Sequence, residues 1–419
     1  MRFPVIGDIS TKDGDGNQNA RLTNTLAESK KNGTTLATVR PGLNALATGS
    51  GSGNSLVCFG GELVNIYGDI VYFVENQGFF VDIGSLGGTD RVPRGMSSDG
   101  SVIVGKASTA GTTPDKAFRW TSGGGIVDLG TLGGTESEAF ACSTDGSVVV
   151  GQAFTATGRA AFRWTSGGGM VNLGTLGGGS SSYNSSQDVS GDGSVVVGYS
   201  ERADGVDRAF RWTSGGGMVD LGTLGPTFAN SNARGISSDG TIVVGYSDVD
   251  YTPTYRAFRW TSGDGMVSLG TLGGNSFALA ISGDGTTIVG YYYSGAEYRA
   301  FRWTSGGGMV DLGTLGPSGT FSQATAVSYD GTTIIGASTT VGATGWHGFR
   351  WTESDGMEDI GPGGYSPGLT GAYSVSDDGL IFGGVNSSPV AMYQFTYPSF
   401  QLTAIGTVTD NHFDFALIP

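Results

Sequence analysis

The 419-residue chain has few of the side chains on which most catalytic and metal sites depend. It contains two cysteines, Cys58 and Cys142, and two histidines, His347 and His412. The cysteines are too few for a disulfide framework and lie outside any Cys-x-x-Cys spacing, so we expect both to be buried thiols. A zinc centre or a Ser/His/Asp triad would have to be built on one isolated histidine. The common hydrolase and zinc-enzyme designs are therefore disfavoured.

Basic residues and long apolar runs are scarce too. The chain has 22 Lys and Arg against 37 Asp and Glu, for a net charge of −15. We therefore do not expect it to bind nucleic acid through the phosphates, because such binding needs clustered Lys and Arg. No apolar run is long enough for a membrane span, and the opening MRFPVIGDISTKDGDG lacks the apolar stretch of a secretory signal. Residues 1–50 carry +2 and the rest −17, so we expect the two parts to contact different partners.

Glycine, in contrast, is abundant, and much of it lies in a repeat. The chain has 77 glycines, yet 38% of its residues are hydrophobic, enough for a sizeable core. The block AFRWTSGGG(I/M)VDLGTLG recurs with its tryptophan 43 to 48 residues apart, alternating with a block S-x-D-G-(S/T)-x-(V/I)-(V/I)-G whose Asp-Gly pairs are 45 to 48 residues apart. The first block begins at Ala117, Ala161, Ala209, Ala257 and Ala300, with a degenerate copy at Gly348. The Asp-Gly pairs begin at Asp99, Asp145, Asp192, Asp239, Asp284, Asp330 and Asp378.

Each period of about 47 residues contains four strand-length pieces. In the copy from Ala139 they are AFACS, SVVVGQA, AFRWT and GMVNLGTL. Asp-Gly between the first two pieces and Gly-Gly-Gly between the last two are strong hairpin signals. Four antiparallel strands repeated many times predict an all-β fold, a β-propeller.

The segments that flank the repeats determine the predicted number of blades. Residues 72–74 align with Phe-Arg-Trp, residues 81–84 align with Val-Asp-Leu-Gly, and Phe395 takes the tryptophan position after the last Asp-Gly pair. We therefore predict eight four-stranded blades over residues 55–405, with seven blades and a separate hairpin as the alternative. Residues 1–54 would be an N-terminal assembly or docking segment, and residues 406–419 a C-terminal tail.

The repeated Phe-Arg-Trp motif is assigned to the scaffold. Alternation along a strand puts Phe and Trp on one face, where we expect them to pack between blades, and Arg on the other. A nine-residue offset across the glycine turn places each arginine opposite an aspartate, an arrangement worth about 0.2 to 1 kcal/mol per pair. The expected pairs are Arg119/Asp128, Arg211/Asp220, Arg302/Asp311 and Arg350/Asp359, with neutral partners in Arg163/Asn172 and Arg259/Ser268.

No motif predicts catalytic, cofactor-binding or metal-binding residues. Each Asp-Gly turn offers one carboxylate where a calcium loop needs several, and the start of a calcium loop at Asp13-Gly-Asp15 lacks the later glycine and glutamate. The parts that vary between copies are loops such as 175–187 and 246–255, which carry Tyr183, Tyr251 and Tyr255. A constant frame with varied loops is typical of a binding or structural module. We predict no enzyme and no cofactor.

The AFRW, DLGTLGG and SxDGxxVVG motifs over residues 80–360 resemble the HAF repeat family, named for His/Ala-Ala-Phe-Arg-Trp segments in bacterial proteins assigned to the cell exterior. The resemblance implies a propeller-like fold. The leading histidine of that family is replaced by Lys116, Arg208, Arg256 and Arg299, and once by Ala160.

Residues 1–85 resemble a different group. An Arg40-Pro41-Gly42-Leu43 turn, a glycine-rich stretch and a strand at 61–67 are similar to the opening of the tail hub or nozzle proteins of short-tailed phages, also described as packaged-DNA stabilisation proteins. The resemblance implies a virion protein that forms a ring of about six copies. Its expected neighbours are tail adaptor or portal-side proteins and a tail fibre or needle, and DNA would pass through without sequence-specific binding.

Two functions from different classes therefore remain. The first is a structural part of a phage tail, located in the virion, that frames the DNA ejection channel and retains packaged DNA. The second is a secreted or surface HAF-repeat propeller, located outside the cell, that binds a protein or a carbohydrate on its loops. A stable ring in native mass measurements supports the first function, and a monomer supports the second.

Overall fold

The computed structural model describes residues 54–59, 62–67, 70–73, 79–109, 112–178, 183–250, 254–293, 295, 297–316, 321–340, 346–360, 371–387 and 390–396. Within these ranges the chain forms strands and turns and no helix, which confirms the all-β prediction. The chain divides into two compact units. One comprises Met1–Gln77 and Pro398–Pro419, and the other comprises Gly78–Tyr397.

The described part of the first unit is a three-stranded antiparallel sheet. Its strands are β1 (Asn54–Phe59), β2 (Glu62–Tyr67) and β3 (Ile70–Phe73), paired in chain order. The sequence had placed these residues in a first propeller blade. The structure corrects that assignment, because none of the three strands pairs with a described strand of the second unit.

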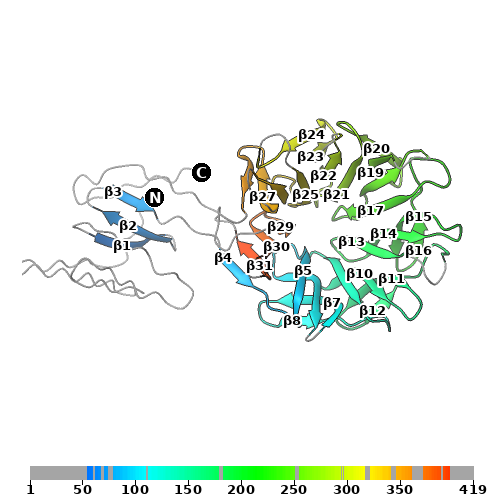
Figure 1. Cartoon of the computed structure of the whole chain (residues 1–419), viewed down its shortest axis with the longest axis horizontal. Helices are drawn as coiled ribbons and strands as arrows, with labels where there is room; N and C mark the ends of the chain where they lie inside the picture. The colour runs from blue at the N-terminus through cyan, green and yellow to red at the C-terminus, as the bar shows by residue number, and fades with distance from the viewer. Residues whose placement is uncertain are drawn as a thin grey trace, which may run out of the picture. The chain divides into compact units, whose positions relative to one another are not determined.

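The described residues of the second unit form seven four-stranded antiparallel sheets arranged in a ring (Figure 1), so the predicted β-propeller is confirmed. The first strand of each sheet contacts the first strand of the next, and β29 contacts β5 to close the circle. These innermost strands are β5 (Gly87–Met96), β9 (Ser137–Cys142), β13 (Ser185–Val189), β17 (Ser231–Ile236), β21 (Ser276–Ile281), β25 (Ser322–Val327) and β29 (Gly371–Val375).

The second strands carry the aliphatic runs that end in glycine, such as Val148-Val149-Val150-Gly151, and the described side chains of these runs are mostly buried, as expected for strands covered on both faces. They are β6 (Val102–Thr109), β10 (Val148–Phe154), β14 (Val195–Glu201), β18 (Val243–Asp248), β22 (Thr287–Tyr293), β26 (Ile334–Thr339) and β30 (Ile381–Ser387). The third strands are β7 (Thr112–Thr121), β11 (Arg159–Thr165), β15 (Asp207–Thr213), β19 (Tyr255–Thr261), β23 (Tyr298–Thr304), β27 (Trp346–Thr352) and β31 (Val390–Thr396). The outer strands are β8 (Gly125–Asp128), β12 (Gly169–Asn172), β16 (Gly217–Asp220), β20 (Gly265–Gly270), β24 (Gly308–Gly313), β28 (Gly356–Asp359) and β4 (Phe79–Asp82).

The last blade combines the two ends of the propeller unit. Strand β4 pairs with β31, and Asp82 lies opposite Tyr393 as Asp128 lies opposite Phe118 in the first full blade. The alignments of residues 81–84 with an outer strand and of Phe395 with the tryptophan position were therefore right. The first choice of eight blades was wrong, because these two fragments belong to one blade and not to two. The alternative count of seven agrees with the seven four-stranded sheets. The propeller unit spans 78–397 where the sequence placed it at 55–405.

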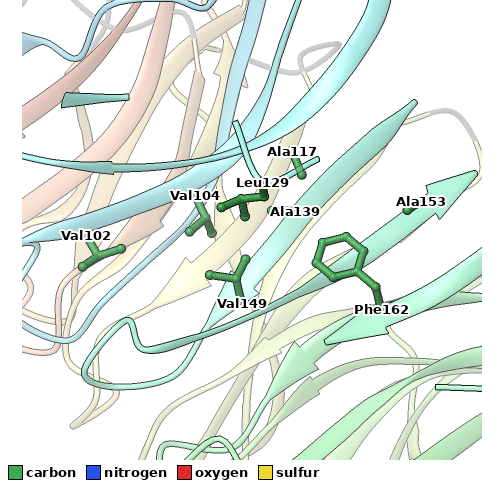
Figure 2. Close-up of a cluster of buried hydrophobic side chains, with 8 residues drawn as sticks. All are labelled: Val102, Val104, Ala117, Leu129, Ala139, Val149, Ala153 and Phe162. Atoms are coloured by element: carbon green, nitrogen blue, oxygen red, sulfur yellow. The ribbon is translucent and has the colours of Figure 1, made fainter. Parts of the chain in front are cut away.

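The hydrophobic core lies between blades. One cluster joins Val102, Val104 and Ala117 of one blade to Val149 and Phe162 of the next, as Figure 2 shows. The phenylalanine of Phe-Arg-Trp is fully buried in all six copies, and the tryptophans pack against the same clusters. This confirms the predicted packing role. Burying each phenylalanine contributes roughly 1.5 to 3 kcal/mol.

The seven Ser-x-Asp-Gly turns are joined to one another by backbone hydrogen bonds. Ser98 donates to the carbonyl of Thr144 (3.0 Å), Thr144 donates to Gly191 (3.0 Å), and the chain of bonds continues turn by turn until Asp377 donates back to Ser98 (2.8 Å). One step shifts by a residue, where Asp284 donates to Tyr329 (3.0 Å). The turns therefore form a closed belt at one end of the propeller.

The predicted arginine–aspartate pairs are wrong by one residue. Arg119 lies opposite Val127, because the glycine turn closes with Thr121 opposite Gly125 and so spans three residues. The same register holds in the other copies, where the residue opposite arginine is the one before the predicted partner. Arg119 instead donates from Nε to the carbonyl of Gly146 in the next blade (2.9 Å), and Arg163 does so to Gly193 (3.2 Å).

The displaced acidic position has its own role. Asp128 accepts a hydrogen bond from the amide of Gly130 (2.7 Å), and Asn172 accepts one from Gly174 (2.9 Å). In another copy Ser268 accepts the equivalent bond from Gly270 (3.1 Å). Asp, Asn and Ser share the ability to cap a turn in this way, which explains why these three residue types alternate at one position of the repeat.

Candidate binding face

The propeller has two chemically different ends. The turn end carries the Ser-x-Asp-Gly turns and the glycine-rich turns between third and outer strands. The loop end carries the connections from second to third strands and from each blade to the next. Since consecutive strands are antiparallel, these two sets of connections lie at opposite ends of every blade. The Ser-x-Asp-Gly turn recurs in all seven blades and the turn between third and outer strands recurs in the six blades whose four strands are consecutive, whereas the loop end differs from blade to blade.

The aspartates of the turn end maintain the turns. Ser143 Oγ donates to Asp145 Oδ1 (2.7 Å), the amide of Ser147 donates to the same oxygen (2.9 Å), and Gly146 takes a φ of +64° that suits glycine. The hydrogen bonds from Ser143 and Ser147 lower the pKa of Asp145 to about 2. Across the described ranges no three His, Cys, Asp or Glu side chains gather where they could hold a metal ion.

One polar cluster at the innermost strands joins three blades. The Arg94 guanidinium contacts Glu138 Oε1 through Nε (3.0 Å) and Nη2 (3.0 Å). Gln152 Nε2 donates to the other oxygen of Glu138 (3.2 Å), and Arg94 lies over the ring of Tyr373 at 5.8 Å. The part-buried Arg94–Glu138 ion pair thus links two neighbouring blades.

A second polar cluster lies around Arg234. Its Nη1 donates to Gln187 Oε1 (2.7 Å), and its guanidinium lies 5.5 Å over the ring of Tyr246. Nearby along β13, Asp188 accepts hydrogen bonds from the amides of Val189 (2.8 Å) and Ile236 (2.9 Å). Burial of the Asp188 carboxyl raises its pKa to about 7. Asp188 thus links two neighbouring innermost strands.

The most distinctive feature of the loop end is a continuous set of aromatic rings, which we term the aromatic row. Ring centroids of successive neighbours lie 4.9 to 6.4 Å apart, within or close to the range of favourable aromatic contacts. Its members come from three consecutive blades and are Tyr246, Tyr255, Phe277, Tyr291, Tyr293, Tyr298, Phe321 and Trp346.

The aromatic row breaks the symmetry of the repeat. Tyr255, Tyr298 and Trp346 occupy the same position, the start of the third strand. The equivalent residues in the other complete copies are Asp115, Arg159 and Asp207. Of the eight members of the aromatic row, Tyr255 alone was identified from the sequence. The signal was present in the aligned copies, but the contacts with Phe277 and Phe321 depend on how blades pack.

The other sequence-predicted residues are dispersed. Tyr183 is 60% exposed with Arg159 over its ring at 5.4 Å. Cys142 is half-buried at a blade interface, and burial raises the pKa of its thiol to about 12. His347 Nδ1 lies 2.9 Å from Asp359 Oδ2. Tyr251, His412, the Asp13 region and the side chain of Cys58 lie outside the described residues.

The fold defines a β-propeller protein whose turn end is similar from blade to blade and whose loop end differs between blades. No protein-family model matches the chain, and no curated protein matches its sequence. Among solved structures, oligogalacturonate lyase from Vibrio parahaemolyticus is 12% identical (TM-score 0.52), with 77% of this chain and 98% of that chain covered. The β-propeller domain of the Trilobed protease from Pyrococcus furiosus, which has an open velcro topology, is 9% identical (TM-score 0.50), with 76% of this chain and 96% of that chain covered.

TolB from Acinetobacter baumannii is 14% identical (TM-score 0.44), with 72% of this chain and 65% of that chain covered. Identities this low show a shared fold alone. The fold by itself does not decide whether the chain is an enzyme. Within the described ranges the chain has no helix that is long and apolar enough to cross a membrane.

Proposed function

We propose that the chain is a non-enzymatic structural component of a phage tail, a nozzle or hub subunit. The observation that carries the proposal is the closure of the propeller by its own strand β4. Because the blade ring is complete within Gly78–Tyr397, both ends of the chain are left to a separate unit. That unit contains the segment that resembles tail nozzle proteins. The segment that would dock to the tail and the propeller therefore belong to different units of the chain.

The charge distribution fits such a part. Residues 1–50 carry +2 and the remainder −17. A ring of about six acidic propellers would repel DNA phosphates and keep DNA from adhering to the channel during ejection. The neighbours in this proposal are tail adaptor or portal-side proteins at one end and a tail fibre or needle at the other.

Deletion of residues 1–40 tests the docking role. We expect the shortened protein to fold, because the propeller closes without this segment, and to lose both ring formation and incorporation into particles. Folding is checked by the β-sheet circular dichroism spectrum and a cooperative melt. If the shortened protein still assembles like the full chain, the docking role is wrong.

The second candidate is a secreted or surface HAF-repeat propeller that binds a protein or carbohydrate. The aromatic row favours it, because clustered exposed aromatic side chains mark binding surfaces. In this case the full chain is a monomer and binds its ligand through the loop end.

A further inference from the structure

The aromatic row is partly exposed to solvent. Tyr298 is 40% exposed and Trp346 is 39% exposed, and the other six rings are half-buried. Both exposed residues stand at the position that carries Asp115, Arg159 and Asp207 in other blades. The scaffold thus tolerates polar side chains there, and the aromatic residues are not needed to complete a blade.

The chemistry of the row favours a ligand that is apolar on one face and polar at its edges. Five of the eight members are tyrosines, which present an apolar ring face and a hydroxyl that donates and accepts hydrogen bonds. Sugar rings match this surface, because their axial C–H groups stack on aromatic faces while their hydroxyls bond to polar groups at the rim.

Charges beside the row already have partners within the protein. Arg299 Nε lies 3.1 Å from Glu297 Oε2, and Arg256 Nη1 donates to the carbonyls of Tyr255 (3.0 Å) and Gly274 (3.3 Å). Arg234, which borders Tyr246, is held by Gln187. Among the described residues beside the row, no cluster of unpaired cations is therefore offered to phosphates or uronates, so a neutral ligand fits better than a charged one.

We infer that the aromatic row is a binding site for a neutral oligosaccharide that lies across three consecutive blades at the loop end. Tyr298 and Trp346 contribute the exposed rings on which the sugar stacks, and half-buried rings of the row pack against them. The site is independent of the proposed tail role and would be the ligand site of the second candidate.

The test uses the full chain and defined sugars. Neutral hexasaccharides of glucose, galactose, mannose and N-acetylglucosamine, in α and β linkages, are titrated calorimetrically and by tryptophan fluorescence. We expect at least one of them to bind. The double variant Y298A/W346A should weaken that binding by at least about tenfold, because two stacking contacts are lost.

Two controls separate stacking from folding. Phe228 is 64% exposed and lies outside the row, so F228A removes a comparable ring and should leave sugar binding unchanged. Y298F keeps the ring face and should retain most of the affinity. The melting temperatures of all variants should remain close to that of the parent chain.

Three results would overturn the inference. They are the absence of binding to every hexasaccharide at millimolar concentration, binding that Y298A/W346A leaves intact, and loss of self-association in Y298A/W346A, which would make the row a contact between subunits. The first two results leave docking through residues 1–40 untouched, so the two proposals can fail separately.

Discussion

At the scale of single residues, the repeat is explained by turn chemistry. Asp128 and its equivalents cap a turn through one hydrogen bond, and the Asp-Gly aspartates organise another turn. The sequence predicted the turns correctly because Asp-Gly and Gly-Gly-Gly favour tight connections. The sequence could not identify the residue opposite each arginine. The same glycine-rich segment is compatible with a three-residue or a four-residue turn, and these two turns differ by one residue in strand register.

Asp128 provides the cleanest test of the cap. We expect D128A to lower the free energy of unfolding by about 0.5 to 1.5 kcal/mol, because the amide of Gly130 loses its acceptor. D128N should be nearly neutral, since Asn172 makes the same bond in the next blade. Chemical denaturation of both variants measures the difference. Equal losses in D128A and D128N would mean that charge, and not the hydrogen bond, matters.

Asp188 should give the propeller a pH dependence. Burial raises the pKa of Asp188 from 3.8 to about 7, so the folded protein holds this proton more tightly than the unfolded chain. The contribution to stability is then fully present below about pH 4 and is lost as pH rises toward 7. Thermal melts at pH 5 and pH 8 should show a smaller loss in D188N than in the parent. Identical pH slopes would contradict the raised pKa.

At the scale of strands, β4 determines how the ring closes. The sequence identified residues 81–84 as an outer strand but assigned it to the wrong blade. Its partner β31 lies about 300 residues away in the chain, and no local pattern encodes such a pairing. The aromatic row was missed for a related reason, because its rings meet only after neighbouring blades have packed.

Ile83, directly after β4, should be essential for this closure. It is 2% exposed and packs with Ile103, Phe118 and Trp120 of the next blade. We expect I83A to lower stability by about 2 to 5 kcal/mol and to speed hydrogen exchange selectively in β4 and β31. L129A, at the equivalent position of the first full blade, should speed exchange in that blade and its neighbour. Unchanged exchange in β31 of I83A would argue against closure through β4.

At the scale of the whole molecule, the sequence predicted a β-propeller from its period and overcounted the blades by one. The belt of hydrogen bonds through seven turns makes the number of described blades evident in the structure. The separation of Met1–Gln77 and Pro398–Pro419 from the propeller agrees with this closure, because β4 supplies the outer strand of the last blade and β1–β3 form a sheet of their own. The proposed docking role of the N-terminal segment belongs to this scale.

Native mass spectrometry of the full chain tests the proposed tail role most directly. Each chain contributes 42.8 kDa. The account predicts a stable ring of about six copies at micromolar concentration, and the variant without residues 1–40 should appear as a monomer in the same buffer. A full-length chain that remains monomeric across this range would contradict the tail role and favour the sugar-binding propeller.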